Sequence, residues 1–257
     1  MASTTTDGIA PALTGEDVPV SDPSPPPRPV LSVIMPVYNE AATLAEVVQR
    51  VLTVDLGLDI DLIAVDDGSS DDSVAILDAI PDPRLRIARH GKNRGKGAAI
   101  RTGLSAATGD IVVIQDADLE YDPAQWARLL RPILDEECDV VYGSRFLGAS
   151  TGMRWQNRLA NKGLTALTRL LFGTGITDME TCYKMIRLEV LDDIRLEAEK
   201  FDIEPEITAR LLRRDVTIRE LPISYEARTH DEGKKIGWRD GLSAVRTLLK
   251  WRLRRTV

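Results

Sequence analysis

The chain has 257 residues, of which 43% are hydrophobic and 28% charged, and its formal net charge is −7 at pH 7. This length suits a single α/β domain with a sizeable core, and the acidic balance argues against a general nucleic-acid-binding protein, which needs a basic surface. The two cysteines, Cys138 and Cys182, are too few for a disulfide framework and lack the spacing of a zinc site. This cysteine usage favours a reducing cytoplasm.

Residues 1–29 are rich in Thr, Ser, Pro and Asp and include three consecutive prolines. Such a segment buries too little apolar surface to offset the entropy of ordering, and it lacks the apolar core of a signal peptide. We therefore predict a disordered tail over 1–29. No apolar run in the sequence approaches the roughly 20 residues of a spanning helix, so we expect any membrane contact to be peripheral.

From Leu31 onward, short apolar runs alternate with segments of helical periodicity. This alternation is typical of an α/β fold in which helical crossovers flank a mostly parallel, Rossmann-like sheet. The polar loops after the strands should then converge on one crevice at the carboxyl edge of the sheet. The predicted strands are 31–35, 60–65, 85–88, 111–114 and 140–142, and the predicted helices between them are 41–52, 73–79, 97–106 and 123–134.

Beyond Tyr142 the alternation weakens. The remaining predicted elements are helices over 155–171, 205–213 and 238–254 and strands over 182–186 and 216–221. Between Arg228 and Val257, nine Lys or Arg residues stand against three Asp or Glu, and leucines recur at helical spacing. We therefore divide the chain into a main domain over 30–237 and a basic, amphipathic C-terminal helix over 238–257.

An acidic cluster, Asp116-Ala117-Asp118 with Glu120, follows the apolar strand 111–114 directly. Carboxylates at a strand end repel one another unless a cation neutralises them. Their hard oxygen atoms suit Mg²⁺ or Mn²⁺, which can also bind the diphosphate of a nucleotide sugar. Taken alone, the cluster could equally be a solvated acidic turn before the next helix.

Two further polar loops follow neighbouring strands: Pro36-Val37-Tyr38-Asn39-Glu40 and Asp66-Asp67-Gly68-Ser69. An aromatic ring and carboxylates in adjoining loops can hold a nucleotide by stacking and by hydrogen bonds. Each loop alone could be an ordinary turn or helix cap. Three such loops on successive strands make that simpler interpretation much weaker.

Basic residues cluster at Lys92, Arg94 and Lys96, just before the predicted helix 97–106. The amino terminus of a helix with flanking cations is a natural anion site. The segment is not a P-loop, because its glycine spacing differs and no Ser or Thr follows Lys96. A solvated basic loop is the alternative interpretation.

These motifs together resemble the inverting family 2 glycosyltransferases with a GT-A fold, and within them the dolichyl- or polyprenyl-phosphate sugar synthases such as dolichol-phosphate mannosyltransferases. LSVIMPVYNE, VDDGSSDDS and the DAD triplet are common to many family 2 enzymes, whereas the later motifs look more like the polyprenyl-phosphate branch. The motifs are LSVIMPVYNE (31–40), VDDGSSDDS (65–73), KNRGKGAAIRTG (92–103), QDADLEYDP (115–123), GSRF (143–146), TDMETCYKM (177–185) and EPEIT (204–208).

The resemblance implies roles for these positions. The nucleotide-sugar donor would be held by Pro36, Tyr38, Glu40, Asp66, Asp67, Lys96, Asp116, Ala117, Arg228 and Lys234, and the metal by Asp116, Asp118 and Glu120. Many relatives have Gln where this chain has Glu120. Arg145 and Arg158 would receive the acceptor phosphate, because the guanidinium fork pairs two phosphate oxygens. Arg228 would contact the donor diphosphate from a flap that also contains Lys234.

The reaction implied is transfer of a hexose, mannose or glucose, from GDP-mannose or a UDP-hexose to polyprenyl or dolichyl phosphate. A lipid phosphate is anionic at pH 7, so it can attack the anomeric carbon without a general base. The first rival is a family 2 transferase with a hydroxyl acceptor, for which Asp178 is the leading base candidate. A nucleotidyltransferase and a non-catalytic nucleotide-sugar-binding module are further rivals.

Two basic stretches, Arg154 to Phe172 and Trp238 to Arg254, have the amphipathic pattern of helices that lie on an anionic membrane surface. We expect a cytoplasmic protein that associates peripherally with the cytoplasmic face of the membrane. The alternative is that both helices pack on the core and expose only a solvated basic face.

Overall fold

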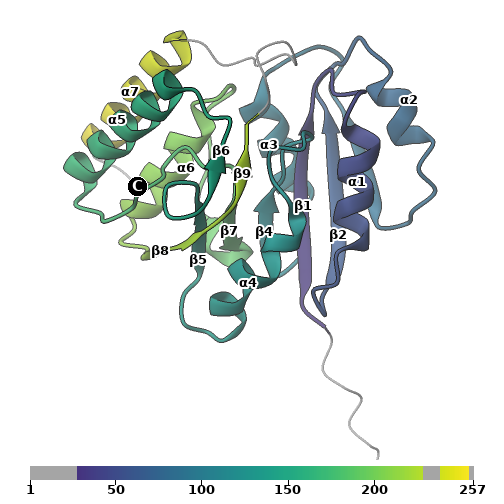
Figure 1. Cartoon of the computed structure of the whole chain (residues 1–257), viewed down its shortest axis with the longest axis horizontal. Coiled ribbons are helices and arrows are strands. Elements are labelled where there is room, and N and C mark those ends of the chain that lie inside the picture. The colour runs from purple at the N-terminus through teal and green to yellow at the C-terminus, as the bar shows by residue number, and fades with distance from the viewer. Residues whose placement is uncertain (1–27, 228–237, 255–257) are drawn as a thin grey trace, which may run out of the picture.

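A computed structural model of the chain describes residues 28–227 and 238–254. Its centre is a seven-stranded sheet in the order β3-β2-β1-β4-β7-β5-β8 (Figure 1). A separate two-stranded ribbon pairs β6 with β9. The strands are β1 (Val30–Val37), β2 (Asp59–Asp66), β3 (Leu85–Arg89), β4 (Ile111–Ile114), β5 (Val140–Ser144), β6 (Ser150–Thr151), β7 (Lys184–Arg187), β8 (Ile218–Pro222) and β9 (Tyr225–Glu226).

The main sheet is mostly parallel. β1 pairs in parallel with β2 and β4, β2 with β3, and β5 with β8. Only β7 runs the other way, inserted between β4 and β5. β1 and β4 lie at the centre and are nearly continuous apolar runs, as expected for strands covered on both faces. This architecture confirms the predicted α/β fold with a mostly parallel central sheet.

Helices flank the sheet on both faces, and each buries an apolar stripe. In α1, for example, Val47, Val48 and Val51 recur at helical spacing and are buried. Pro123 starts a short 3₁₀ turn, capped by the Asp122 carboxylate, that leads into α4. The helices are α1 (Leu44–Thr53), α2 (Ser73–Asp78), α3 (Lys96–Ala106), α4 (Trp126–Leu134), α5 (Trp155–Phe172), α6 (Ile203–Leu212) and α7 (Trp238–Leu253), with 3₁₀ turns η1 (Pro123–Gln125) and η2 (Leu188–Leu191).

The C-terminal helix α7 is present as predicted, but its apolar face points inward. Leu248 and Trp251 are buried in a second apolar cluster formed with α6 and the segment around Met179. The Trp251 ring carries the guanidinium groups of Arg210 and Arg254 at 4.2 and 4.8 Å from its centroid. Core packing therefore accounts for Leu248 and Trp251, while Leu242, Leu249 and Leu253 of the same helix are exposed, and contact of α7 with a membrane stays a prediction.

Several sequence predictions fall on residues outside the described ranges. These are most of the predicted tail 1–29 and the flap that contains Arg228 and Lys234. Within residues 28–227 and 238–254, no helix is both long enough and apolar enough to cross a bilayer.

Candidate active site

A cavity of about 810 Å³ opens at the carboxyl edge of the sheet. The loops after β1, β2, β4 and β5 contribute its floor, and α5, α6 and α7 contribute further walls. Ten of the predicted site residues line this cavity. They are Pro36, Tyr38, Glu40, Asp67, Lys96, Asp116, Ala117, Asp118, Glu120 and Arg145.

The loop after β1 is tied to the loop after β2. Asn39 adopts a left-handed backbone conformation with φ of 53°, which asparagine tolerates better than most residues. Its side-chain oxygen accepts a hydrogen bond from the Ser70 amide at 2.8 Å, and its own amide donates to the Ser69 hydroxyl at 3.0 Å. These bonds fix the path of the chain between Tyr38 and Glu40, whose side chains face the cavity.

The consecutive carboxylates Asp66 and Asp67 have different surroundings. Asp66 is buried, accepts hydrogen bonds from the Gly68 and Ser69 amides, and does not line the cavity. Asp67 lines the cavity but accepts bonds from the Arg94 and Gly95 amides at 2.9 and 2.7 Å. Both carboxylates therefore shape the loops, and of the two only Asp67 borders the space where a nucleotide would lie.

These loops also pack backbone against backbone. Gly68, with φ of 73°, lies so close to Lys92 that a Cβ atom would come within 2.6 Å of the Lys92 carbonyl carbon. Gly95 and Gly97 approach the backbone of the 198–200 segment with equal closeness. Larger side chains cannot occupy these positions without moving backbone.

The Lys96 ammonium forms an ion pair with the acidic cluster. Its Nζ is 2.7 Å from the Asp116 carboxylate and 3.3 Å from Glu204, which itself pairs with Lys184 at 2.5 Å. Burial disfavours the charged form of Lys96, but the negative charges of Asp116 and Glu204 outweigh it and raise the pKa of Lys96 well above its usual value. Lys96 is thus a fixed cation within the predicted metal and anion site.

The rest of the acidic cluster is held from the other side. The Glu120 amide donates to Asp118 at 3.0 Å, and the Tyr225 hydroxyl donates to the Glu120 carboxylate at 2.7 Å. Across the described part of the chain, no three His, Cys, Asp or Glu side chains are arranged as a ready metal site. Asp116, Asp118 and Glu120 all line the cavity, and their role as metal ligands stays a prediction.

Arg145 faces the acidic cluster from the end of β5. Its Nε and one terminal nitrogen donate to the two oxygens of Asp178 at 2.7 and 2.8 Å, and its amide also donates to Asp178. Asp178 is fully buried, does not line the cavity, and has both oxygens occupied by this guanidinium. This arrangement suits a residue that positions Arg145, and it gives Asp178 no access to a hydroxyl acceptor.

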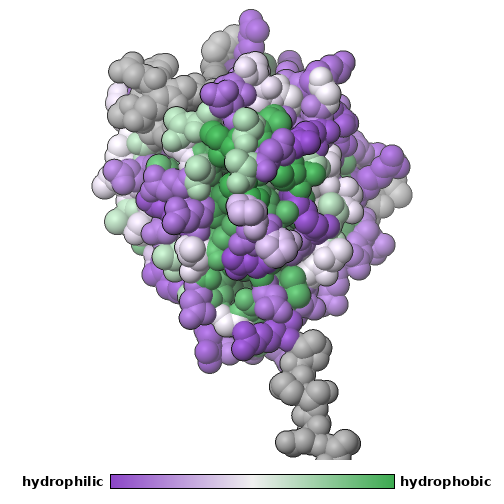
Figure 2. Space-filling view, turned by 90° about the vertical axis from the view of Figure 1, so that its right-hand side faces the viewer, coloured by the Kyte–Doolittle hydropathy of each residue, from purple (hydrophilic) through white to green (hydrophobic). Residues whose placement is uncertain are grey.

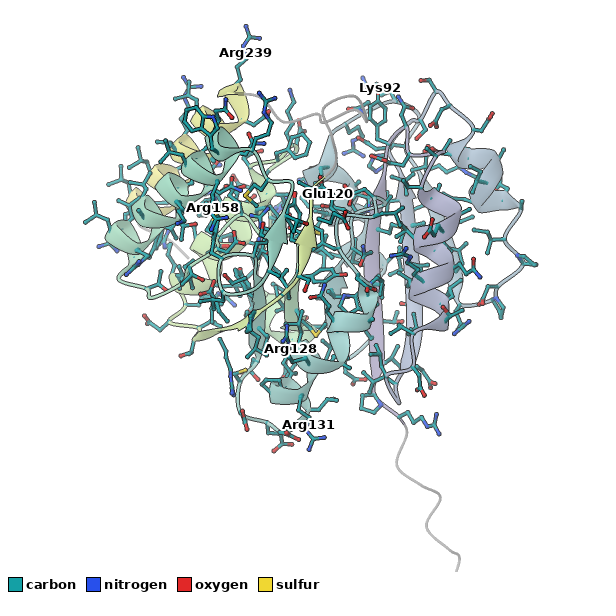
Figure 3. The ribbon with its side chains drawn as sticks, in the orientation of Figure 1. Lys92, Glu120, Arg128, Arg131, Arg158 and Arg239 are labelled. Carbon is teal, nitrogen blue, oxygen red and sulfur yellow. The ribbon has the colours of Figure 1, made fainter. Side chains whose placement is uncertain are left out.

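Arg158 does not reach the cavity. It is exposed on α5, where its guanidinium lies 5.6 Å from the centroid of the Phe146 ring, and Figure 3 shows it apart from Glu120. Its neighbours Asn157 and Asn161, one helical face away, line the cavity instead. The structure therefore brings Arg145 into the site and leaves Arg158 outside it.

Residues 32–195 match the family model described as glycosyl transferase family 2. The chain belongs to this family. Among its relatives, the polyprenol monophosphomannose synthase of Mycolicibacterium smegmatis is 31% identical over 216 residues, which cover 80% of each protein. The undecaprenyl-phosphate 4-deoxy-4-formamido-L-arabinose transferase of Enterobacter sp. is 31% identical over 79% of this chain, which spans only 62% of that relative.

A family 2 fold is also found among solved structures. The glucosyl-3-phosphoglycerate synthase of Mycobacterium tuberculosis, crystallised with Mn²⁺, UDP and phosphoglyceric acid, superposes with a TM-score of 0.70. The two proteins are 24% identical in sequence, and the match covers 88% of this chain and 79% of that one. This likeness establishes the shared fold.

In this family 2 chain, several residues that line the cavity were assigned no role from the sequence, and one of them is Glu180. Glu180 lies in the quoted TDMETCYKM motif, but the motif alone assigned it no role. Its Oε1 is enclosed without a hydrogen-bond partner, and the carboxyl borders the cavity. Burial raises the pKa of Glu180 to about 7, with the charge of Lys184 opposing the rise.

Three more residues without a predicted chemical role line the cavity: Glu204, Tyr225 and Asp240. Glu204 comes from the EPEIT motif, so its presence was visible in the sequence, but its pairing with Lys96 depends on tertiary packing. Tyr225 lies in the two-residue strand β9, and Asp240 lies in the first turn of α7. Strands of two residues and helix-to-cavity contacts have no sequence pattern of their own.

Proposed function

We propose that this chain transfers a hexose from a nucleotide sugar to a polyprenyl phosphate, with inversion at the anomeric carbon. The observation that carries the proposal is that the Arg145 guanidinium, fixed by Asp178, lines the same cavity as Asp116 and Asp118. A carboxylate wall suits the cation-bound diphosphate of a donor, and an oriented guanidinium suits a phosphate acceptor. The names of both relatives specify a polyprenyl-type carrier, undecaprenyl phosphate in one and polyprenol in the other.

The donor side would be formed by the loops after β1, β2 and β4. Tyr38 and Asp67 would border the nucleoside. Lys96 would contact the diphosphate once a cation that arrives with the donor takes its place at Asp116. The remaining proposed donor contacts are Arg228 and Lys234, which lie outside the described residues. GDP-mannose and a UDP-hexose are the proposed donors, with mannose or glucose as the sugar.

A divalent cation fits the donor side. Asp116 and Asp118 line the cavity, and their hard carboxylate oxygens suit such a cation. The Lys96 ammonium, now 2.7 Å from Asp116, would have to leave that carboxylate when the cation binds. Asp116, Asp118 and Glu120, whose carboxylate accepts from the Tyr225 hydroxyl, are the proposed residues that would hold Mg²⁺ or Mn²⁺. The cation would neutralise charge on the departing nucleoside diphosphate.

The acceptor side needs no general base for this reaction. A phosphate monoester is already anionic at pH 7, so its oxygen can form the new bond to the anomeric carbon as the bond to the diphosphate breaks. Arg145 would hold the other phosphate oxygens, and Asp178 would keep the guanidinium in place. The products are a polyprenyl phosphate sugar and a nucleoside diphosphate.

A hydroxyl acceptor is the second candidate, and Glu180 is the observation that favours it. A carboxyl with a pKa of about 7 at the cavity wall has the proton affinity that a general base needs. Glu180→Gln separates the two proposals. Transfer to phosphate should persist in the variant, whereas transfer to a hydroxyl should fall by at least about 100-fold.

The direct test is an assay of radiolabelled GDP-mannose, UDP-glucose and UDP-N-acetylhexosamines against short-chain polyprenyl phosphates, with Mn²⁺ or Mg²⁺. We expect one donor class to give a butanol-extractable product. Arg145→Lys should lower kcat/KM for the acceptor by about 100-fold or more, because an ammonium cannot reproduce the bidentate pair. Product formed only with hydroxyl acceptors would overturn the lipid-phosphate proposal.

The site of action proposed for this enzyme is the cytoplasmic face of a membrane, where a polyprenyl phosphate is anchored. Because no described helix can span the bilayer, contact would be peripheral and would involve an anionic membrane surface. The names of the two relatives described above support a lipid-linked acceptor.

A further inference from the structure

The outward face of α5 is apolar along its whole length. Trp155, Leu159 and Leu170 are 70%, 64% and 81% exposed. At about 100° per residue these three positions, with exposed Gly163 and Ala166, fall within an arc of about 80°. We name these five residues the outer stripe. Stripes of this kind on a soluble protein mark an interaction surface.

The outer stripe is separate from the part of α5 that packs on the protein. Thr165 and Thr168 on the opposite side are buried, and Leu164 packs into the second apolar cluster. Asn157 and Asn161 on that inward side line the cavity. One helix therefore carries a cavity wall on one face and exposed apolar side chains on the other.

A basic border runs beside the outer stripe. Arg158, Lys162 and Arg169 are exposed next to it, and α5 contains no Asp or Glu although the chain as a whole has a net charge of −7. Arg158 and Lys162 both lie 5.6 Å from the centroid of the Phe146 ring, which holds their stems against the protein. Apolar side chains flanked by cations complement the headgroup region of an anionic bilayer.

The opposite side of the molecule differs in how far its apolar side chains are exposed. Figure 2 views the side bounded by β3, where apolar surface gathers in the middle of the face among hydrophilic side chains. Among the described residues, none of the highly exposed large apolar side chains belongs to α1, α2 or β3. The charge and exposure of α5 are therefore particular to the side that also carries α7 (Figure 1).

We propose that α5 is the membrane-docking element, with the outer stripe inserted at the headgroup boundary of an anionic bilayer and the basic border on lipid phosphates. Such a helix lies in the membrane plane rather than across it. Its inward face would then bring the cavity wall next to the lipid from which the acceptor comes. That last step rests on the proposed function, whereas docking itself does not.

A second copy of this chain is the competing occupant of the stripe. In an isologous dimer the same surface meets itself, so Arg158, Lys162 and Arg169 of one copy would approach those of the other without an acidic partner on α5. An anionic bilayer supplies the opposite charge. The charge pattern therefore favours the membrane.

The test of docking is cosedimentation of the full chain with vesicles of phosphatidylglycerol and phosphatidylcholine. The triple variant Trp155→Ser, Leu159→Ser, Leu170→Ser should lose at least about tenfold in partitioning, since three inserted apolar side chains are removed. The matched control, Leu134→Ser with Arg128→Gln, alters exposed residues of α4 far from α5 and should bind like the original chain (Figure 3). Equal binding of the triple variant and the original chain would overturn the proposal.

A second pair of variants tests the charge component. Lys162→Gln with Arg169→Gln should lower partitioning by about tenfold on anionic vesicles, and raised salt should remove most of this difference. On phosphatidylcholine vesicles alone the two proteins should differ little. Analytical ultracentrifugation tests the competing dimer. If the original chain is a dimer, the triple variant is a monomer and neither protein binds vesicles, the outer stripe is a self-association surface and the membrane proposal is overturned.

Activity assays separate this proposal from the proposed function. With a water-soluble, short-chain polyprenyl phosphate, the triple variant should keep its kcat/KM, because none of the three residues lines the cavity. With a long-chain acceptor embedded in anionic vesicles, its rate should fall with its partitioning. Vesicle binding without sugar transfer to any acceptor would support docking and overturn the proposed function. Sugar transfer without vesicle binding would support the proposed function and overturn docking.

Discussion

Two carboxyl groups two residues apart, the buried Asp178 and the half-buried Glu180, have opposite electrostatic surroundings. Both oxygens of Asp178 accept hydrogen bonds from the Arg145 guanidinium, so the negative charge of Asp178 is compensated within the protein. Glu180 has one enclosed oxygen without a partner, so burial penalises its charged form. The first carboxyl fixes a cation in place, and the second can exchange a proton near neutral pH.

The raised pKa of Glu180 predicts a pH effect on stability. The folded pKa of about 7 exceeds the ordinary glutamate pKa of 4.5, so the folded state binds more protons between these values and the free energy of unfolding falls as pH rises through this window. Glu180→Gln should remove up to ~3 kcal/mol of that fall. Urea denaturation of both proteins at about pH 5 and about pH 8 measures it. An unchanged pH slope in the variant would contradict the assignment.

At the acidic cluster, Asp118→Ala should abolish sugar transfer while leaving the fold intact. The side chain lines the cavity, and its described hydrogen bond is local, to the Glu120 amide. Steady-state rates with Mn²⁺, together with the thermal midpoint, check both parts. Asp135→Ala removes the same charge from the end of α4 and should retain full activity. Near-normal turnover by folded Asp118→Ala would remove the metal role proposed for this carboxylate.

At the scale of elements, α7 contributes to both stability and the site. Asp240, Gly241 and Ala244 in its first turns line the cavity, and Trp251 near its end is buried between Arg210 and Arg254. The Arg213 guanidinium also donates to the Trp251 carbonyl at 2.7 Å. The buried end of the helix therefore holds the cavity-lining end in place.

This coupling makes Trp251→Ala a strong test of the packing of α7. Loss of a buried indole should cost about 3–5 kcal/mol of unfolding free energy and should also weaken donor binding, because a cavity wall loses its support. Leu249→Ala changes an exposed neighbour on the same helix and should stay within about 0.5 kcal/mol of the original. Denaturant unfolding and donor titration of the two variants measure these effects. Similar losses in both would contradict the packing.

At the scale of the whole molecule, ligand binding should stabilise the native state by mass action. At a free concentration of about 100 times its dissociation constant, the correct donor with Mn²⁺ adds about 2.7 kcal/mol, which corresponds to a rise of about 5–10 °C in the thermal midpoint for a domain of this size. Differential scanning fluorimetry across nucleotide sugars measures this shift. Chelation should reduce it, and a chain that responds to no nucleotide sugar would contradict the proposed donor class.

The sequence predicted much of this fold because central parallel strands are continuous apolar runs. The run 111–114 gave β4 with the same bounds, and Leu31 marked the start of the ordered pattern. The order of strands was not predictable, since β7 enters between β4 and β5 from a distant part of the chain. Nor could the pattern show β6 and β9, which have two residues each.

The loops that form the candidate site were predicted from the sequence, but the ion pairs between their side chains were not. Carboxylates after a strand indicate a crevice, and most of them line the cavity. The pairing of Asp116 with Lys96, and the enclosure of Asp178 by Arg145, depend on segments brought together by the sheet. Arg158 was assigned from the family resemblance, and the helix rotation that turns it outward is set by packing of the opposite face of α5.

The backbone contacts of Gly68, Gly95 and Gly97 have a consequence for engineering donor preference. Three loops and the 198–200 segment meet without intervening side chains, so a substitution in one loop displaces its neighbours instead of reshaping a local subsite. New selectivity for base or sugar is therefore best sought at lining positions outside these contacts, such as Gln156, Asn161 and Phe201, where a library can vary size and polarity without disturbing the interlocked frame.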